Sequence, residues 1–345
     1  MLKSIKLQNF RSYKIQEFSF STKTNFIVGP NASGKTNILE AILCLNTGRS
    51  YRGSDENLIK FNEDWARVDG EYLNNQSRSL ILTKSVNKTT KKQLLNNNDN
   101  KKTLNFPTII FDPNQLFLLY GSPELRRSFL DNILEGIDPT YKKINQDYFR
   151  VLKQRNSLLK QTNTNKDVLF PWNIKISQLA ESIVQRRVEL VNSLNELITS
   201  NYQDLSSDKK HVRVEYLSIK TVKSNYSSIL LKLLEQNLAK ELIIGHTLFG
   251  PHKDDFEVYL NNQRSSVVGS RGENRSLVLT LKKCELDLIK TKLNKNPMVL
   301  LDDVFSELDK ARRSQLINLF KDQQTIYTTT SIDKTELSNT NMIQL

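Results

Sequence analysis

Eight consecutive residues near the start of the chain combine glycine, lysine and a hydroxyl side chain at a spacing that suits phosphate chemistry. They read Gly29-Pro30-Asn31-Ala32-Ser33-Gly34-Lys35-Thr36. Glycines let the backbone curl so that successive N–H groups face phosphate oxygens, while Lys35 offers a positive charge and the Thr36 hydroxyl can ligate Mg²⁺. The segment therefore predicts a phosphate-binding loop whose eight residues bind ATP, with Mg²⁺ held by Thr36.

Two adjacent carboxylates follow an apolar segment near the other end of the chain. The apolar residues 298–301 precede Asp302 and Asp303. A phosphate-binding loop needs a carboxylate from a neighbouring strand end to hold its metal ion, and we expect Asp302 to be that Mg²⁺ ligand. Asp303 would orient or deprotonate the attacking water, so Asp303 and Lys35 are the expected catalytic residues. These aspartates lie far from Lys35 along the chain, which indicates a large insertion between the two halves of the site.

A short polar turn precedes the aspartates and begins a predicted helix. It reads Ser270-Arg271-Gly272-Glu273. A serine hydroxyl, backbone N–H groups and the helix dipole together make an anion-binding arrangement. An ordinary serine cap of a helix is the alternative, but the position of the turn before the Asp302 strand favours the anion site.

The elements that position these residues are predicted from hydrophobic periodicity and turn residues. A strand at 24–28 enters the phosphate-binding loop and a helix at 38–45 leaves it, which argues against a structural turn that matches the motif by chance. Between about 122 and 238 the pattern is mainly helical and is interrupted at Pro171 and at the polar segment around 163–166. Further strands are expected at 2–10, 15–21, 65–73, 77–86, 108–111, 211–217, 256–260, 298–301 and 325–329, and further helices at 273–293 and after Asp309.

Composition limits the classes of protein to which the chain can belong. Its 345 residues are 38% hydrophobic and 25% charged, as in ordinary globular proteins. The net charge of +13 favours a polyanionic partner, and a solvated lysine-rich surface is the alternative. Cys44 and Cys284 have neither disulfide nor zinc-site spacing. No apolar stretch approaches the roughly 20 residues of a membrane span, so we expect a cytoplasmic protein with no membrane partner.

The chemistry-bearing segments resemble the ABC-type ATPases and, among them, the RecF family of bacterial recombination mediators. In ABC-type ATPases a signature turn acts on the opposite subunit's ATP, which the resemblance assigns to Ser270, Arg271, Gly272 and Glu273. The residues Ser306, Glu307, Leu308 and Asp309 resemble the loop that lines the dimer interface. Asn9-Phe10-Arg11-Ser12-Tyr13 resembles the family's N-terminal segment, whose arginine approaches the nucleotide, so Arg11 joins the expected ATP-binding residues.

Other blocks similar to RecF run from residue 2 to about 330. They include the stretch from Gly121 to Asp131 with Arg126-Arg127, the segments 152–156 and 250–255, and the stretch from Leu300 to Asp309. Two alternatives stay open for Arg126 and Arg127, contact with DNA phosphates or ion pairs inside the helical part, and neither is favoured. His252 is a sensor or ligand, or a member of a hydrogen-bonded turn, and the turn is favoured.

The chain departs from relatives at three places. The family usually has an acidic pair where this chain has Asn114-Gln115, which puts a water-positioning role there in doubt. Ala32 stands where many relatives have the second glycine of the phosphate-binding loop. After the last strand the chain reads Thr328-Thr329-Thr330-Ser331, without the histidine of ABC transporters, which RecF also lacks.

The resemblance implies an α/β fold in which an ABC-type P-loop ATPase head carries an inserted helical lobe. We expect the head at 1–120 and 245–345 and the mainly helical insertion at 121–244. It also implies an ATP-dependent homodimer that binds duplex DNA or junctions of single- and double-stranded DNA. The family assists RecA loading at gapped DNA with RecR and RecO, and its members are weak DNA-dependent ATPases.

Three other classes of protein fit the sequence less well. A transport ATPase subunit requires the missing histidine, and an SMC-like structural ATPase requires long heptad coiled coils that the insertion lacks. A nuclease joined to such a head requires a second cluster of metal-binding carboxylates, and the sequence offers no convincing candidate.

Overall fold

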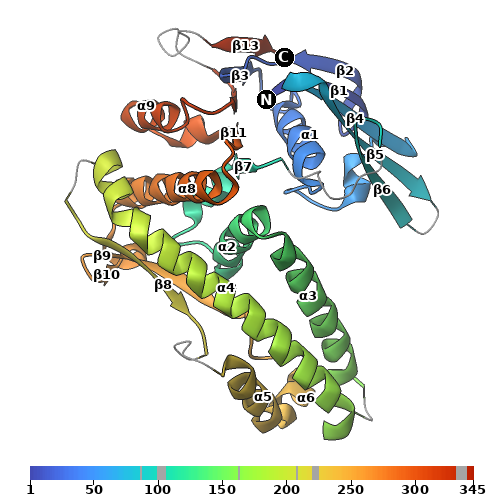
Figure 1. Cartoon of the computed structure of the whole chain (residues 1–345), viewed down its shortest axis with the longest axis vertical. Helices are drawn as coiled ribbons and strands as arrows, with labels where there is room; N and C mark the ends of the chain where they lie inside the picture. Colours follow the sequence, from blue (N-terminus) through green and yellow to red (C-terminus); the bar gives the residue numbers. More distant parts are fainter. Residues whose placement is uncertain (86–87, 99–105, 162–163, 207–208, 220–224, 332–339) are drawn as a thin grey trace. The chain divides into compact units, whose positions relative to one another are not determined.

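The computed structural model describes residues 1–85, 88–98, 106–161, 164–206, 209–219, 225–331 and 340–345. The chain divides into two compact units, which are drawn in Figure 1. Unit 1 comprises Met1–Gln115 with Ile289–Leu345, and unit 2 comprises Leu116–Leu288. Both ends of the chain therefore belong to unit 1.

Unit 1 contains a five-stranded antiparallel sheet. Its strands in spatial order are β2 (Tyr13–Ser19), β1 (Leu2–Phe10), β4 (Trp65–Tyr72), β5 (Gln76–Ser85) and β6 (Lys88–Leu95). Alternate side chains of β4 are buried, as in a sheet with one covered face. The short 3₁₀ helices η1 (Asp55–Leu58) and η2 (Leu73–Asn75) lie in its connections.

The second sheet of unit 1 is parallel and holds the carboxyl ends of the strands that carry the predicted site. Its strands in spatial order are β13 (Asn341–Gln344), β3 (Thr24–Val28), β12 (Thr325–Thr329), β11 (Met298–Asp302) and β7 (Thr108–Phe111). All five residues of β11 are buried, because a parallel strand is covered on both faces. Antiparallel and parallel strands thus form separate sheets.

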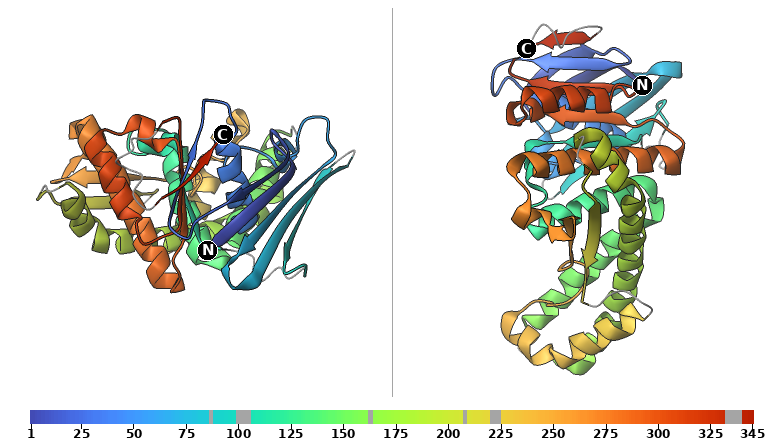
Figure 2. Two further views of the ribbon diagram at one scale, coloured as in Figure 1. Left: turned by 90° about the horizontal axis from the view of Figure 1, so that it is seen from above. Right: turned by 90° about the vertical axis from the view of Figure 1, so that its left-hand side faces the viewer.

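Helix α1 (Lys35–Thr47) lies between the two sheets (Figure 2, left). Its side chains share one apolar core with residues of both sheets, which explains why ten of its thirteen residues are buried. On the other side of the parallel sheet, the rings of Phe26 and Tyr327 stack, and the ring of Phe305 packs against both at a tilt. The remaining elements of unit 1 are η4 (Val304–Glu307) and α9 (Lys310–Leu319), while η3 (Pro113–Phe117) contains the first junction with unit 2.

Unit 2 is mainly helical and includes a small antiparallel sheet. The sheet has the strand order β10 (Gln263–Arg264), β9 (Asp255–Leu260) and β8 (Val212–Leu217). The helices are α2 (Pro123–Ile137), α3 (Pro139–Leu159), α4 (Lys166–Ser206), α5 (Tyr226–Gln236), α6 (Leu238–Ile244), α7 (Ser265–Val268) and α8 (Arg271–Leu293), the last of which contains the second junction.

Two buried arginines organise polar clusters inside unit 2. In the Arg155 cluster, the guanidinium donates to Asn173 Oδ1 at 2.8 Å, Thr247 Oγ1 at 2.7 Å and Glu241 Oε2 at 2.7 Å. Both Arg155 and Glu241 are fully buried. A buried charge requires such partners, so this cluster joins α3, α4 and α6.

In the Arg187 cluster, the guanidinium of Arg187 on α4 donates to both carboxylate oxygens of Asp131 at 3.0 Å. It also donates to the carbonyl oxygen of Pro251 at 2.7 Å. Tyr216, which accepts a further hydrogen bond from Arg187, donates to Asp254 Oδ2 at 2.7 Å. The cluster therefore connects α2, α4, β8 and the loop before β9.

Most predicted elements agree with the structure, and one expectation differs from it. The strands at 24–28, 108–111 and 325–329 are confirmed residue for residue. The predicted interruption around 163–166 falls between the end of α3 and the start of α4, whereas the one predicted at Pro171 is wrong, because Pro171 lies inside α4. Pro171 lies five residues after the first residue of the helix, where its missing N–H removes one backbone hydrogen bond. The buried neighbours Leu169 and Asn173 keep this part of the helix packed.

Residues 245–288, which the resemblance assigns to the head, belong to compact unit 2. The reason is the pairing of β9 with β8 from Val212↔Leu260 to Leu217↔Asp255, a long-range contact that the sequence pattern does not contain. Which residues act together as an ATPase head stays a prediction.

Candidate nucleotide-binding site

The predicted phosphate-binding loop connects the end of β3 to the start of α1 in unit 1. Lys35 Nζ donates to the carbonyl oxygens of Gly29 at 2.8 Å and Pro30 at 2.7 Å, so the loop curls around the lysine. Gly34 has a φ of 101°, which an L side chain rarely adopts, and a Cβ there would lie 2.6 Å from the hydroxyl of Tyr13. Glycine is therefore required at this position for two independent reasons.

Ala32 also has a left-handed backbone, with a φ of 64°. A non-glycine residue in this region costs roughly 1 kcal/mol or more. This conformation explains why glycine suits the position. The loop of this chain adopts it with alanine, at the conformational free energy just given.

The structure brings the loop threonine and the late aspartate together. Thr36 Oγ1 donates to Asp302 Oδ1 at 2.8 Å, although 266 positions separate them in the sequence. The parallel order β3, β12, β11 places the carboxyl ends of these strands at one edge of the sheet, where α1 also begins. The expected pairing of loop and carboxylate is thus present in the geometry.

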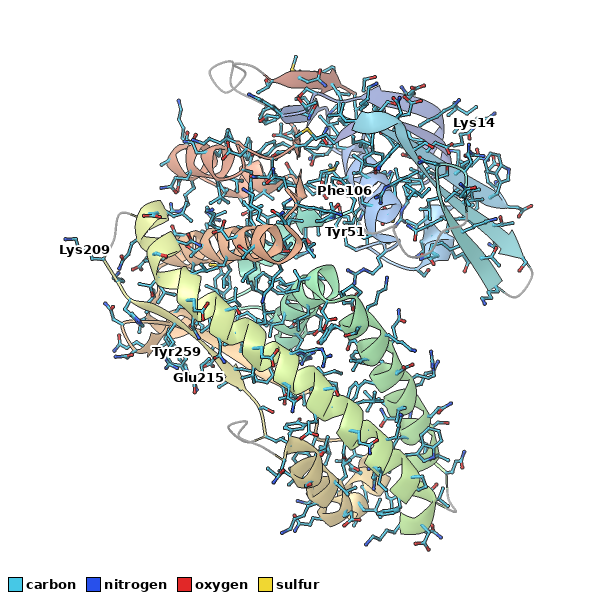
Figure 3. All side chains as sticks on the ribbon, in the orientation of Figure 1. Lys14, Tyr51, Phe106, Lys209, Glu215 and Tyr259 are labelled. Atoms are coloured by element: carbon cyan, nitrogen blue, oxygen red, sulfur yellow. The ribbon has the colours of Figure 1, made fainter. Side chains whose placement is uncertain are left out.

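Two further hydroxyl groups hold Asp302, and neither was predicted. Thr328 Oγ1 donates to Oδ1 at 2.8 Å, and the Tyr51 hydroxyl donates to Oδ2 at 2.9 Å (Figure 3). Thr328 lies opposite Asp302 in the register of β12 and β11, so correct strand pairing would have identified it. Burial and then the Asp302 carboxylate raise the pKa of Tyr51 far above its usual value, which keeps the hydroxyl protonated as a donor.

Asp303 differs from Asp302 in its conformation and in its hydrogen bonds. Its φ is 48°, a left-handed backbone, and its Oδ1 is buried without a hydrogen-bond partner. Desolvation raises the pKa of the Asp303 carboxyl, and the neighbouring Asp302 adds to this while Lys35 opposes it. A carboxylate with a raised pKa and an open lone pair is suited to accept a proton.

The site fits a nucleotide with Mg²⁺. Ser33 Oγ in the loop is buried without a partner, as is Asp303 Oδ1, and buried polar atoms in proteins are rarely left in that state. The hydroxyl of Thr36 and the carboxylate of Asp302 offer the oxygen ligands that Mg²⁺ prefers. Thr36 and Asp302 would hold the metal, and the loop with Lys35 would hold the phosphates.

Arg11, expected to approach the nucleotide, is held by an acidic residue of α1. Its Nε and Nη2 donate to the two oxygens of Glu40, each at 2.7 Å, and Glu40 is fully buried. The Arg11 backbone is left-handed, with a φ of 52°. Its guanidinium is thus fixed to the helix that follows the loop.

The predicted signature turn begins α8 in unit 2. Ser270 Oγ accepts from the N–H of Glu273 at 3.2 Å, while Glu273 Oε2 accepts from the N–H of Ser270 at 2.8 Å. This reciprocal pair is a capping box. Hydrogen bonds from Lys210 and then Ser270 lower the pKa of Glu273 to about 2. Ser270 and Arg271 are exposed, with Gly272 beside them half-buried.

The predicted dimer-interface loop follows Asp303. Ser306 Oγ donates to the carbonyl oxygen of Asp303 at 2.7 Å and remains exposed, with Glu307 beside it half-buried. Leu308 is buried, and Asp309 Oδ1 accepts from the N–H of Arg312 at 2.9 Å as the cap of α9. In this chain Leu308 and Asp309 therefore also have structural tasks.

The blocks left open by the sequence lie in the polar interior of unit 2. Arg126 donates to both oxygens of Asp255 at 2.6 Å and 2.7 Å, and Arg127 donates to the carbonyl oxygen of Asp254 at 2.9 Å. Arg126 thus forms the predicted ion pair, and Arg127 forms a hydrogen bond to the backbone of the same unit. His252 Nδ1 lies 2.6 Å from the Tyr148 hydroxyl, and burial lowers the pKa of its imidazole to about 4, in agreement with a hydrogen-bonded turn.

The departure at Asn114-Gln115 lies in η3, which follows β7 at the same edge of the parallel sheet as Asp302. The N–H of Asn114 donates to Asp112 Oδ1 at 2.8 Å. Gln115 Oε1 is buried without a partner, so the amide that replaces the family's carboxylate retains an open acceptor.

Among the residues that the structure describes, no helix is long and apolar enough to cross a membrane.

Comparisons with known proteins agree with these features. A family model described as the RecF/RecN/SMC N terminal domain matches residues 1–344. The DNA replication and repair protein RecF of Exiguobacterium sp. (strain AT1b) is 36% identical over 346 residues, covering 96% of this chain and 93% of that protein. The RecF protein of Bacillus thuringiensis (strain Al Hakam) is 35% identical over 350 residues, covering 97% of this chain and 93% of that protein.

Solved structures give the same result. A structure of the recombination mediator protein RecF with ATP superposes with a TM-score of 0.84 at 31% identity, covering 96% of this chain and 92% of that one. An SMC head bound to a winged-helix domain of ScpA has a TM-score of 0.52 at 17% identity and shares the fold. The contact between the phosphate-binding loop and Asp302 agrees with these matches. The family model and the RecF relatives show that this chain belongs to the RecF family.

Proposed function

We propose that this chain is an ATP-dependent, DNA-binding recombination mediator that dimerises when it binds ATP. Its relatives are named DNA replication and repair proteins, and membership of their family gives the chain a role in those processes. Its relatives in solved structures hold ATP, which supports ATP as the nucleotide. The finer proposal is that ATP binding closes a dimer on gapped DNA and assists RecA loading, with RecR and RecO as partners.

The contact between Thr36 and Asp302 is the observation that carries the proposal, because it joins two distant segments into one site with open acceptors beside it. Mg²⁺, when bound, neutralises charge on the outer phosphates. Lys35 gives up its two carbonyl partners to meet a phosphate, while Thr36 and Asp302 hold the metal. Asp303 accepts the proton of the attacking water, and its raised pKa suits that task.

Completion of the site by a second copy is also part of the proposal. Ser270, Arg271, Gly272 and Glu273 of one subunit would contact the ATP of its partner, since the dipole at a helix N-terminus attracts anions. The loop from Ser306 to Asp309 would line the same interface. Hydrolysis would be slow and would serve to release the dimer from DNA.

Binding of DNA is proposed from family membership and from the net charge of +13. Contacts between lysine or arginine and phosphate release counterions, so affinity should fall steeply with salt and depend little on base sequence.

Sedimentation velocity with and without ATP and gapped duplex DNA tests the proposal. The wild-type chain should become dimeric with ATP and Mg²⁺ and bind DNA, and its DNA affinity should fall by about a thousandfold between about 50 and 200 mM salt if six or more phosphates are contacted. Lys35→Ala removes the charge that meets the outer phosphates and should abolish the ATP-dependent dimer. Lys14→Ala, an exposed lysine of β2, is the matched control and should behave as wild type.

Normal dimerisation of Lys35→Ala on addition of ATP would contradict the assigned loop. Affinity for DNA that does not change with salt would remove nucleic acid from the proposal.

A further inference from the structure

Tyr51 lies four residues beyond the end of α1 and belongs to no sequence motif described above. Its hydroxyl nevertheless donates to Asp302 Oδ2 at 2.9 Å, while both threonine hydroxyls, Thr36 and Thr328, donate to Oδ1. Each carboxylate oxygen of Asp302 thus has its own donor set. Tyr51 donates to Oδ2, the carboxylate oxygen to which Thr36 does not donate.

The backbone around Tyr51 is fastened to α1. Ser50 Oγ donates to Glu40 Oε1 at 2.6 Å, the same carboxylate that receives the two hydrogen bonds from Arg11. On the other side of Tyr51, Arg52 Nη1 donates to Asn37 Oδ1 at 3.3 Å. Glu40 and Asn37 lie one turn apart on α1, immediately after the phosphate-binding loop, so the segment 50–52 is held at both of its ends.

This support extends to the N-terminal hairpin. Asn37 Nδ2 donates to Ser12 Oγ at 2.9 Å, and Arg11 precedes Ser12 at the turn between β1 and β2. Arg11 and Ser50 therefore bond to the same carboxylate, that of Glu40. The ring of Tyr51 also packs against the core that surrounds α1, which limits the positions open to its hydroxyl.

A carboxylate that binds a metal is usually oriented by a hydrogen bond to its other oxygen, because free rotation about the bond to the carboxyl group would misdirect the lone pairs. Such outer partners change metal affinity without touching the metal. Oδ1 of Asp302 lies beside Thr36, which is the side where the loop would hold Mg²⁺.

We propose that Tyr51 is a positioning residue that fixes the rotation of Asp302, with Oδ1 directed to Mg²⁺, and that Arg11, Glu40 and Ser50 hold Tyr51 in place. The inference rests on the proposed function, because it deepens the assignment of Asp302 as the ligand of the nucleotide's metal. It concerns the affinity for Mg²⁺ in the nucleotide complex and not the affinity for the nucleotide alone.

The test is a titration of Mg²⁺ at a fixed concentration of a fluorescent ATP analogue bound to the full chain, followed by fluorescence. Tyr51→Phe keeps the ring and removes the donor, so the Mg²⁺ concentration at half-saturation should rise about tenfold. The affinity for the analogue in EDTA should stay at the wild-type value. Mn²⁺ in place of Mg²⁺, followed by paramagnetic resonance, reads the metal affinity directly.

Tyr72→Phe is the matched control, because the Tyr72 hydroxyl bonds to Asn46 in the same core and not to Asp302. Its Mg²⁺ midpoint should remain within about twofold of wild type. In an Asp302→Asn background, Tyr51→Phe should add no further shift, because its effect passes through that carboxylate.

An unchanged midpoint in Tyr51→Phe would overturn this inference alone, as would an equal shift in Tyr72→Phe or a further shift in the Asp302→Asn background. A wild-type chain that binds the analogue identically with and without Mg²⁺ would overturn the proposed function and this inference with it.

Discussion

In unit 2 all three nitrogens of the Arg155 guanidinium donate to an oxygen acceptor. In unit 1, by contrast, two oxygens at the candidate site, Ser33 Oγ in the phosphate-binding loop and Asp303 Oδ1, are buried without a hydrogen-bond partner. Both regions contain charged side chains drawn from distant parts of the chain. In the Arg155 cluster the charges satisfy each other, and in unit 1 part of the hydrogen-bonding capacity is left for another molecule.

The difference has a thermodynamic meaning. A saturated buried network costs much if one member is removed, because its partner is left as an uncompensated buried charge. Open polar atoms reduce stability in the free protein and are retained where a ligand satisfies them. We therefore expect substitutions in the Arg155 cluster to change the free energy of unfolding, and substitutions at the loop and Asp303 to change nucleotide chemistry.

The largest effect on stability is expected for Arg155→Met, which leaves Glu241 buried without its cation. The free energy of unfolding should fall by about 3 to 5 kcal/mol, while ATP binding by the folded fraction is unchanged. Arg150→Met on the same helix is the control, because the Arg150–Asp147 pair is exposed and should contribute less than about 1 kcal/mol. Urea unfolding followed by circular dichroism measures both, and equal losses would contradict the contrast between the clusters.

A second effect concerns pH, since burial raises the pKa of Asp254 to about 6 and lowers the pKa of His252 to about 4. The folded state binds the Asp254 proton more tightly than the unfolded state does, so the contribution of Asp254 to stability falls as pH rises from about 4 to 6. For His252 the unfolded state binds the proton more tightly, so its contribution rises between about pH 4 and 6.5. In the wild-type chain the two contributions oppose each other.

Replacing one of the two residues should reveal the pH dependence of stability that the other one contributes. Relative to wild type, Asp254→Asn should gain stability as pH rises from about 4 to 6, and His252→Gln should lose it, each by on the order of 3 kcal/mol across the window. Denaturant unfolding at several pH values measures the two slopes. Slopes of the same sign in the two variants would show that these groups do not titrate as the burial of unit 2 requires.

The smallest effect on stability is expected at Asp303, where the consequence for chemistry should be large. Asn tolerates the left-handed backbone and carries no desolvated charge, so Asp303→Asn should be as stable as wild type or more stable by less than about 1 kcal/mol. ATP hydrolysis should slow by about a hundredfold or more, with binding retained, because the proton acceptor is lost. The measurements are thermal unfolding and single-turnover hydrolysis.

Asp302→Asn serves as the comparison at the adjacent position. It should weaken Mg²⁺-dependent ATP binding itself, since Asp302 is the proposed metal ligand. If Asp303→Asn hydrolyses ATP at the wild-type rate, the different assignments of the two aspartates are wrong.

Local patterns were sufficient for the elements of unit 1 that carry the site. The alternation and apolar runs of β3, β7 and β12 reproduce their bounds, because strand formation there depends on residues that are adjacent in sequence. The glycines and lysine of the loop also predicted the curl around Lys35, because backbone conformation and side-chain charge are local properties. Pro171 shows the limit of such reasoning, since its effect depends on where α4 begins.

The sequence by itself therefore determined which residues offer phosphate and metal chemistry and which segments are strands or helices. Only the tertiary structure decided how they meet: the order β3, β12, β11 brings Thr36, Thr328 and Asp302 together, and the segment after α1 adds Tyr51. The tertiary structure also pairs Arg126 with Asp255, whereas the sequence left open whether this arginine contacts DNA or forms an ion pair. The physical reason is that strand order and buried polar pairing arise from contacts between residues distant in sequence, for which a single sequence contains no periodic signal.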